Sequence, residues 1–236
     1  ECDQFNGIHE GLVQSWKDIF PKKGEIHFAG ALENNEDTGT LQYLASTAME
    51  AGFSTRVLDM QALDLQNGRF FDPAGELVNR CFKLYPWEWM VDESPDGCLA
   101  EMEWLEPIWK LVMSNKAILA TLYELFPDSP YVLPCYLSRP RSGLFCKKPV
   151  FSREGHNVSV VDIRDWEEYV RIAETEGDYN TGAYVYQEYV EPTAYSGRYP
   201  VIGSWIIGGE AAGIGIRENR MEVTDNLSEF VPHIIG

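Results

Sequence analysis

The stretch of this chain best suited to chemistry is residues 144–160, whose sequence is LFCKKPVFSREGHNVSV. The pattern predicts a strand that ends in a lysine, then a short loop, then a second strand. Lys148 precedes Pro149, which lacks a backbone N–H and keeps the chain extended. The loop at 152–155, SREG, offers a hydroxyl, a glycine and backbone N–H groups that can line an anion. A cation beside such a loop suits the phosphates of a nucleoside triphosphate, although an ordinary hairpin with a solvated lysine explains this segment equally well.

A second lysine adds to this hint. Lys116 follows Ser114 and Asn115, a pair typical of the residue that caps a helix amino end. The stretch 104–126 has a helical pattern that is interrupted near Ser114, so a new helix is expected to begin there. A positive side chain at that end of a helix is slightly unfavourable unless an anion is shared with it.

The predicted secondary structure of the chain includes a βαβ unit near the amino end. Residues 25–32 form a short apolar strand, 33–40 a polar loop, 40–53 a helix ending at Gly52, and 54–63 a second strand. Short connections of this kind favour a parallel sheet, so we expect a Rossmann-like half over 22–105. No GxGxxG follows the first strand, and dinucleotide binding is therefore not indicated. The aromatic stretch 77–93 is interpreted as core packing in preference to a ligand platform.

Composition limits the possible partners. The chain has 236 residues and a net charge of −18, which argues against a nucleic-acid backbone or an anionic membrane. A polycationic substrate would suit that charge, although solubility alone explains most acidic surfaces. The five cysteines are widely spaced without a CxxC pair, so neither a zinc site nor a disulfide framework is predicted and a cytoplasmic location is expected. The chain opens without methionine on a helical pattern, and we expect it to be a fragment.

Seven blocks of the sequence together resemble the glutathionylspermidine synthetase family, in its ATP-grasp synthetase portion and the bacterial homologues of that portion. In order they are DQFNGIHEGL, EDTGTLQYL, FKLYPWEWM, WLEPIWKLVMSNKAIL, KKPVFSREGHNV, IGSW…AGIGIRE and FVPHII. The resemblance implies an α/β (α+β) chain with an ATP-grasp fold and a Rossmann-like pre-ATP-grasp domain. On this basis residues 1–21 are a helical lead-in, 22–105 the Rossmann-like domain and 106–236 the ATP-grasp domain, part of which is expected from upstream residues.

The resemblance also implies an activity. Family members use ATP to activate a carboxylate as an acyl phosphate, which an amine attacks to give an amide. The expected partners are a small-molecule or peptide carboxylate and an amine, with polyamines among the candidates. Glutathione and spermidine are the eponymous pair, and nothing in the sequence selects the actual substrates.

Site residues follow from the matching blocks. Arg217 is implied as the catalytic clamp near the reacting carboxylate or phosphate. The ATP-binding residues implied are two phosphate lysines, a loop over the phosphates and an adenine hinge: Lys116, Lys148, Ser152, Arg153, Gly155, Gln187, Glu188, Tyr189 and Val190. The substrate cleft is matched, less specifically, by Glu36, Asp37, Lys83 and Glu88.

The magnesium ligands are a departure from the family pattern. The family supplies them from an arginine–aspartate strand and a Glu-Asn-Asn motif that precede the DQFN block, where this chain begins. The tempting substitute at 33–35, Glu-Asn-Asn, follows that block and is rejected. Without hard oxygen ligands the phosphate charge is not neutralised, so this chain alone is expected to be catalytically incomplete.

Two alternatives to a ligase stay open. One is a non-catalytic, nucleotide-binding relative that acts as a scaffold or binds a partner. The other is a general globular module whose lysines are solvated.

Overall fold

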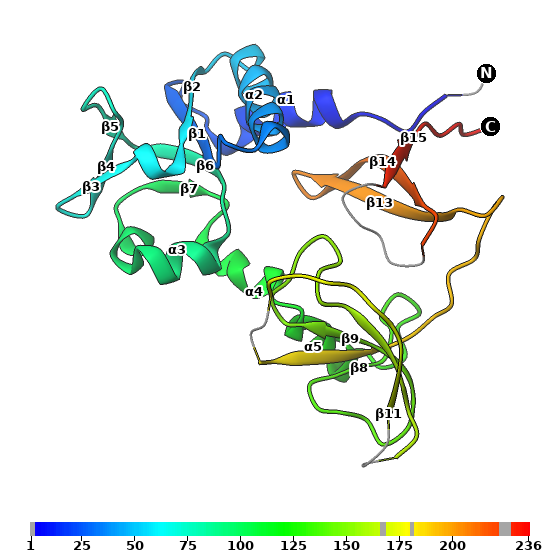
Figure 1. The fold of residues 1–236 in the computed structure, drawn as a ribbon. Coiled ribbons are helices and arrows are strands. Elements are labelled where there is room, and N and C mark those ends of the chain that lie inside the picture. The colour runs from blue at the N-terminus through cyan, green and yellow to red at the C-terminus, as the bar shows by residue number, and fades with distance from the viewer. Residues whose placement is uncertain (1–2, 166–168, 180–181, 222–227) are drawn as a thin grey trace. The chain divides into compact units, whose positions relative to one another are not determined.

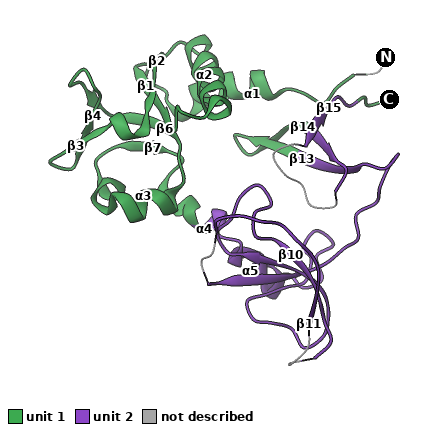
Figure 2. Cartoon of the chain, viewed as in Figure 1, with its two compact units in different colours: residues 1–111, 204–214, 234–236 green, residues 112–203, 215–233 purple. Residues whose placement is uncertain are grey.

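The computed structural model describes residues 3–165, 169–179, 182–221 and 228–236 and has a mixed α/β fold (Figure 1). The chain forms two compact units, coloured separately in Figure 2. Unit 1 comprises Glu1–Leu111, Ser204–Ile214 and Ile234–Gly236, and unit 2 comprises Val112–Gly203 and Gly215–His233. Among the described residues, no helix has both the length and the apolar character needed to cross a membrane.

Unit 1 is built on a parallel four-stranded sheet with the order β2-β1-β6-β7. The strands are β1 (Glu25–Gly30), β2 (Ser54–Asp59), β6 (Arg80–Leu84) and β7 (Glu103–Leu105). Helices α1 (Ile8–Ile19) and α2 (Asn35–Glu50) pack on one face. The remaining elements are a small sheet, β3 (Asp64–Gln66), β4 (Arg69–Phe71) and β5 (Leu77–Val78), the helix α3 (Trp87–Glu93), and three single turns at Met60–Ala62, Pro95–Leu99 and Ile108–Lys110.

Alternation along β1 divides the core of unit 1 into two clusters. Ile26 and Phe28 point towards the helices and pack with Trp16 and Leu41. Ala29 points to the opposite face and joins the cluster that includes Cys81 and Trp87. Successive side chains of a strand face opposite sides, so each face of a strand buried on both sides needs its own apolar partners.

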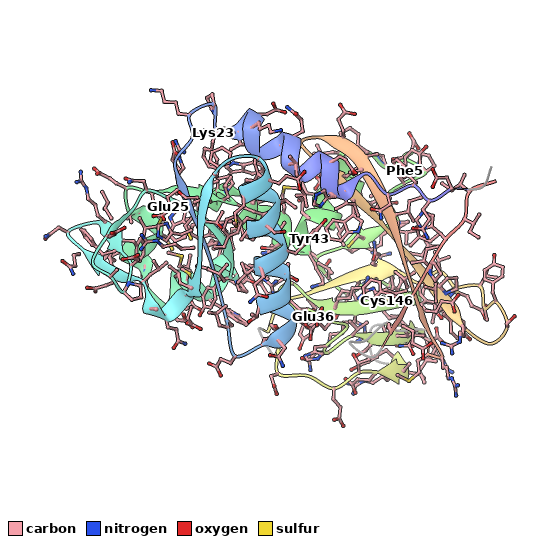
Figure 3. All side chains as sticks on the ribbon, turned by 90° about the horizontal axis from the view of Figure 1, so that it is seen from above. Phe5, Lys23, Glu25, Glu36, Tyr43 and Cys146 are labelled. Atoms are coloured by element: carbon pink, nitrogen blue, oxygen red, sulfur yellow. The ribbon has the colours of Figure 1, made fainter. Side chains whose placement is uncertain are left out.

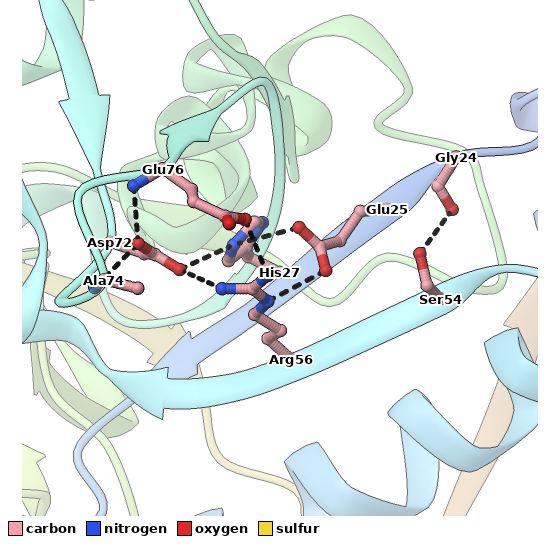
Figure 4. Close-up of polar contacts among 8 residues, drawn as sticks. All are labelled: Gly24, Glu25, His27, Ser54, Arg56, Asp72, Ala74 and Glu76. Carbon is pink, nitrogen blue, oxygen red and sulfur yellow. Dashed lines mark hydrogen bonds and ion pairs between the residues drawn. The ribbon is translucent and has the colours of Figure 1, made fainter.

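The small sheet is joined to the main sheet by one arginine (Figure 4). Arg56 of β2 donates to Glu25 at 2.9 Å, to Asp72 at 2.5 Å and to Glu76 at 2.7 Å. Asp72 also accepts the backbone N–H groups of Ala74 and Glu76, and these bonds lower its pKa most, with Arg56 adding to the effect. The turn between β4 and β5 is thereby fixed to strands β1 and β2.

Unit 2 holds an antiparallel five-stranded sheet with the order β11-β10-β9-β12-β8. Its strands are β8 (Cys135–Tyr136), β9 (Gly143–Pro149), β10 (Ser159–Ile163), β11 (Tyr169–Glu174) and β12 (Tyr184–Glu188). Helix α4 (Leu111–Ser114) leads into the unit and α5 (Ala117–Leu125) packs on the sheet. A further sheet joins β13 (Tyr199–Ile207), β14 (Glu210–Asn219) and β15 (Glu229–Val231), and the tip of the β13–β14 hairpin belongs to unit 1.

The mixed α/β class and the parallel βαβ unit predicted from the sequence are confirmed. The predicted polar loop over 33–40 is wrong, because α2 already begins at Asn35. The Asn34 side chain caps this helix by accepting the backbone N–H of Glu36 at 2.9 Å, and this local bond starts the helix before the apolar pattern begins. The predicted second strand is shorter than expected and ends at Asp59, where a single helical turn follows.

The buried bond between Trp16 and Thr47 yields a test of the core of unit 1. The indole N–H of Trp16 donates to Oγ1 of Thr47 at 2.9 Å, and Thr47 is fully buried. Thr47→Val keeps the side-chain shape but leaves that N–H without its acceptor, so we expect a loss of ~1–3 kcal/mol in the free energy of unfolding. Urea unfolding measures the change.

A double-mutant cycle isolates the cause. In a Trp16→Phe background there is no indole N–H to desolvate, and Thr47→Val should then cost clearly less. Equal costs in the two backgrounds would show that the hydrogen bond is not what holds this part of the core.

Candidate functional site

The pairing of β9 with β12 positions Lys148. Lys148 lies opposite Val185 and Cys146 lies opposite Gln187, so these side chains share one face of the sheet. The ammonium of Lys148 donates to Oε1 of Gln187 at 2.7 Å. Helix α5 covers the neighbouring apolar part of this face, where Val185 and Cys135 are buried. Burial raises the pKa of the Cys135 thiol and nearby Lys148 opposes that shift, which places the lysine beside the apolar patch.

Lys116 approaches the same strand end from α5. Its backbone N–H donates to the carbonyl of Val150 at 2.8 Å, one residue beyond β9. Its ammonium donates to the carbonyl of Ser152 at 2.5 Å and to Oγ of the same serine at 3.0 Å. The side chain of Asn115 accepts the N–H of Ala117 at 2.9 Å and so starts the helix there. The structure thus brings both predicted lysines to the segment that leaves β9.

Lys147 provides an internal contrast, since it points to the opposite face of β9. Its ammonium lies 3.9 Å from the ring centroid of Tyr184. It lines a small cavity of about 100 Å³ with Tyr169 and Tyr186 on that face. Adjacent lysines of one strand therefore serve different surroundings, as the alternation of strand side chains requires.

The SREG loop is anchored at its far side. Glu154 and Gly155 adopt positive φ angles of 55° and 74°, and the N–H of His156 donates back to the carbonyl of Arg153 at 2.8 Å. Thr175 then holds the loop, because its hydroxyl donates to the carbonyl of Gly155 and accepts the N–H of Val158. The left-handed backbone at Gly155 is the conformation that favours glycine at this position.

The predicted adenine hinge lies at the end of β12. The N–H of Glu188 donates to the carbonyl of Pro134 at 2.8 Å, and the N–H of Tyr189 donates to the carbonyl of Leu144 at 3.0 Å. Val190 is exposed. Gln187, predicted as a hinge residue, is engaged by Lys148 through its side chain. One hydrogen bond therefore links the predicted hinge to the lysine predicted to bind phosphate.

Arg217 belongs to the other sheet of unit 2. It is half-buried on β14, opposite Phe230 of β15, with its guanidinium 5.9 Å from the centroid of that ring. The described contacts of Arg217 do not include Lys116 or Lys148. Its predicted place beside the phosphates stays a prediction.

The four predicted substrate residues lie in unit 1 near the carboxyl ends of the parallel strands. Glu36 and Asp37 occupy the first turn of α2, where carboxylates favour the helix dipole. Lys83 of β6 is buried, and its ammonium donates to the carbonyl of Tyr85 at 2.7 Å. Burial lowers the pKa of Lys83 to about 8, against the opposing charges of Glu106 and Glu88. Glu88 and Lys83 are therefore brought together, as the sequence grouping suggested.

Glu36 also lines an apolar cavity of about 830 Å³ within unit 1. Tyr43 of α2, Leu12 of α1 and Trp205 of the hairpin tip contribute to its wall. Figure 3 labels Glu36 and Tyr43 on the same helix, with Glu36 near its start. Glu106 is the second carboxylate of this cavity, and the sequence interpretation missed it. Its position just after β7, at the carboxyl edge of a parallel sheet, is the signal that could have found it.

Within the described part of the chain, no group of three or more His, Cys, Asp or Glu side chains is arranged to hold a metal ion. In the Glu-Asn-Asn stretch at 33–35, Asn34 caps α2 and Asn35 is its first residue.

Comparisons with known proteins agree on one family. The sequence pattern of the family described as glutathionylspermidine synthase preATP-grasp matches residues 1–236. A candidate acid–amine ligase of Haemophilus influenzae is 35% identical over 98% of this chain and 62% of its own length. Trypanothione synthetase of Crithidia fasciculata is 28% identical over 88% of this chain and 35% of its own length.

Two further comparisons extend this picture. The bifunctional glutathionylspermidine synthetase/amidase of Escherichia coli is 26% identical over 98% of this chain and 42% of its own length. The crystal structure of a candidate gamma-glutamylcysteine synthetase from Methylobacillus flagellatus has a TM-score of 0.62 at 10% identity, covering 97% of this chain and 75% of that one, and shows likeness of fold alone. The chain spans less than two thirds of the length of each of these curated relatives. With the family pattern matched from end to end, this chain belongs to the glutathionylspermidine synthase preATP-grasp family.

Proposed function

We propose that this chain is part of an ATP-dependent ligase, with an ATP-grasp fold, that joins a carboxylate to an amine. The observation that carries the proposal is the placement of two lysines around the exit of β9. The backbone N–H of Lys116 donates to Val150, which directly follows β9, and Lys148 is the next-to-last residue of that strand. Two cations on separate elements beside one loop suit a triphosphate, because they offset the charge that develops during phosphoryl transfer.

The chemistry of such a ligase divides among the described residues. ATP supplies the phosphoryl group that turns the carboxylate into an acyl phosphate, from which the amine displaces phosphate. Lys116 and Lys148 bind the phosphates, and the loop with Ser152, Arg153 and Gly155 covers them and excludes water. Lys116 already contacts Ser152 twice, so movement of this loop and of the lysine are coupled.

The other residues assigned to the nucleotide lie on or just after β12 and on β14. We assign the adenine edge to residues 187–190, which comprise the last two residues of β12 and the two that follow it. We assign the reacting carboxylate or phosphate to Arg217, whose planar guanidinium can bind two oxygens at once. The hydrogen bond from Lys148 to Gln187 supports this arrangement, since it joins the phosphate and adenine ends of the site.

The amine partner is assigned to unit 1. Carboxylates attract an ammonium group, and Glu36, Asp37, Glu88 and Glu106 gather near the carboxyl edge of the parallel sheet. The apolar walls of the 830 Å³ cavity suit an amine carried on an aliphatic chain. Lys83, with a pKa of about 8, can exchange a proton near neutral pH.

Magnesium prefers hard oxygen ligands, and the described residues include no group of three or more His, Cys, Asp or Glu side chains arranged to hold a metal ion. We assign no residue of this chain to the metal and expect its ligands in another segment of a longer protein. A second candidate is a nucleotide-binding relative without catalysis.

Turnover distinguishes the two candidates. The test uses a protein that contains this chain and extends to the full length of the relatives. It is incubated with ATP, Mg²⁺, a peptide carboxylate and an amine. We expect phosphate release that requires all four components, and a product whose mass is the sum of the two substrates less one water. Nucleotide binding without phosphate release for every pair of a broad panel would support the non-catalytic relative instead.

Lys148 and its neighbour form a matched pair for testing nucleotide binding. Lys148→Ala should weaken ATP affinity at least about tenfold, because a charge-assisted bond to phosphate contributes ~1.5–3 kcal/mol. Lys147→Ala changes the same strand but removes a cation on the opposite face, and it should leave the affinity within about twofold. Calorimetric titration measures both, and equal effects of the two substitutions would contradict the phosphate role of Lys148.

Lys83 yields a prediction on pH. Its pKa of about 8 lies below its ordinary value of 10.5, so the unfolded state binds more protons between these values. The stability of the protein should therefore rise with pH across that window as the buried charge is lost. In NMR spectra of protein labelled with [¹³C]lysine, one Cε signal should titrate near pH 8 and vanish in Lys83→Met.

Glu106→Gln tests whether the charge of Glu106 opposes the lowering of the Lys83 pKa. Glu106 is the largest charge that opposes the shift, and its removal should lower the pKa of Lys83 further. A Lys83 signal that titrates near its ordinary value of 10.5 would rule out its proposed role in proton exchange.

A further inference from the structure

Unit 1 contains a second cavity at the opposite edge of its parallel sheet. The cavity has a volume of about 760 Å³ and is lined by the amino-terminal parts of three strands. Glu25 and His27 come from β1, Arg80 from β6 and Glu103 from β7. The proposed amine site lies at the carboxyl edge, so the two cavities share the sheet but none of their lining residues.

His27 forms a polar part of the lining of this cavity. Its side chain is only 2% exposed, and neither ring nitrogen has a hydrogen-bond partner of normal geometry among the described residues, although the backbone of Arg80 is near enough to favour the protonated ring. The nearest carboxylate oxygens are Oε2 of Glu25, 3.7 Å from Nε2, and Oδ2 of Asp72, 3.9 Å away (Figure 4). A buried polar ring without a partner is costly, and it indicates a place where a ligand can supply the missing bonds.

The ring is neutral at neutral pH. Burial lowers the pKa of His27 below its ordinary value of 6.5, and Arg56 acts in the same direction, while Glu25, Asp72 and the backbone of Arg80 oppose the shift. A neutral imidazole has one donor and one acceptor nitrogen. It can therefore accept a hydrogen bond from an ammonium group.

The charges around the cavity are balanced, in contrast to the net charge of −18 on the chain. Three cations and three carboxylates line it: Lys23, Arg69, Arg80, Glu25, Glu101 and Glu103. A lone anion or a lone cation would meet as much repulsion as attraction from such a lining. A ligand that carries both charges can match both sets.

The hydrogen bonds already made show which atoms remain for a ligand. Oε1 of Glu25 accepts from Arg56, which leaves Oε2 on the side of His27. Arg80 donates through Nε to Glu103 at 2.8 Å and through Nη1 to the carbonyl of Lys22 at 3.1 Å. Its Nη2 has no hydrogen-bond partner within the described ranges. The guanidinium is held over the ring of Phe20, 4.5 Å from the centroid, so its position is fixed.

We propose that this amino-edge cavity binds a small zwitterion, an amino acid or short peptide, with its ammonium at Glu25 and His27 and its carboxylate at Arg80. Gly24 supports the arrangement, since a Cβ there would lie 3.3 Å from Nη1 of Arg80 and crowd the carboxylate end. The ligand is bound without chemical change. The site is independent of ligase activity, and its test does not depend on the outcome of the turnover experiment.

Histidine NMR tests the proposal on the unaltered chain. The protein has four histidines, so a sample labelled with [¹⁵N]histidine gives four sets of imidazole signals. The probes are the common amino acids and glycyl dipeptides, each added singly up to about 10 mM. We expect at least one probe to shift the His27 signals in a saturable way, while those of exposed His9 stay unchanged.

Blocked versions of the binding probe define its chemistry. Acetylation of the amine and amidation of the carboxyl each remove one charge, and each should weaken binding at least about tenfold. Arg80→Gln and Glu25→Gln should have similar effects. Arg198→Gln, at an ion-paired arginine of unit 2, is the matched control and should bind as the parent protein does.

Any of four outcomes would overturn the proposal. The first is a complete absence of shifts at His27 with all probes. The second is undiminished binding of both blocked derivatives, and the third is undiminished binding by folded Arg80→Gln protein. If only the acetylated probe keeps its affinity, the cavity takes an anion and the zwitterion assignment is wrong.

Discussion

One backbone hydrogen bond carries much of the proposed nucleotide site. The N–H of Lys116 donates to the carbonyl of Val150 at 2.8 Å and so joins the start of α5 to the exit of β9. Because Lys148 lies two residues before Val150, this bond brings the backbones of two lysines that are 32 positions apart in sequence to the same end of β9. The apolar contacts of α5 with Val185 and Cys135 hold the helix in this position. Repulsion between nearby cations is tolerated where an anion is to bind between or beside them.

Unit 1 depends on a different constraint, the direction of its parallel strands. All four strands run the same way, so every residue that ends a strand lies at one edge and every residue that begins a strand lies at the other. Lys83 and Glu106 lie towards the carboxyl edge, whereas Glu25 and Arg80 lie at the amino edge. One sheet thereby separates the mainly apolar cavity that Glu36 lines from the charged cavity that His27 lines.

The polar network around Arg56 shows how that separation is maintained. Arg56 binds three carboxylates, and two of them come from the turn between β4 and β5. This turn covers the face of the sheet that bears His27 and keeps the ring buried. A network that satisfies its own charges can bury a polar residue, but it leaves His27 with carboxylates just beyond bonding distance.

Local pattern in the sequence determined the βαβ unit, the break near Ser114 and the strand ending in Lys148, because period and capping residues act over a few positions. It also carried the seven blocks that placed the chain in its family. The start of α2 at Asn35 was missed, since a single side-chain bond outweighed the polar composition of 33–40. Only the tertiary structure decided that Gln187 meets Lys148, that Glu106 joins the cavity of Glu36, and that His27 is buried without a partner. Those facts depend on strand register and on contacts between distant segments, which local preferences do not encode.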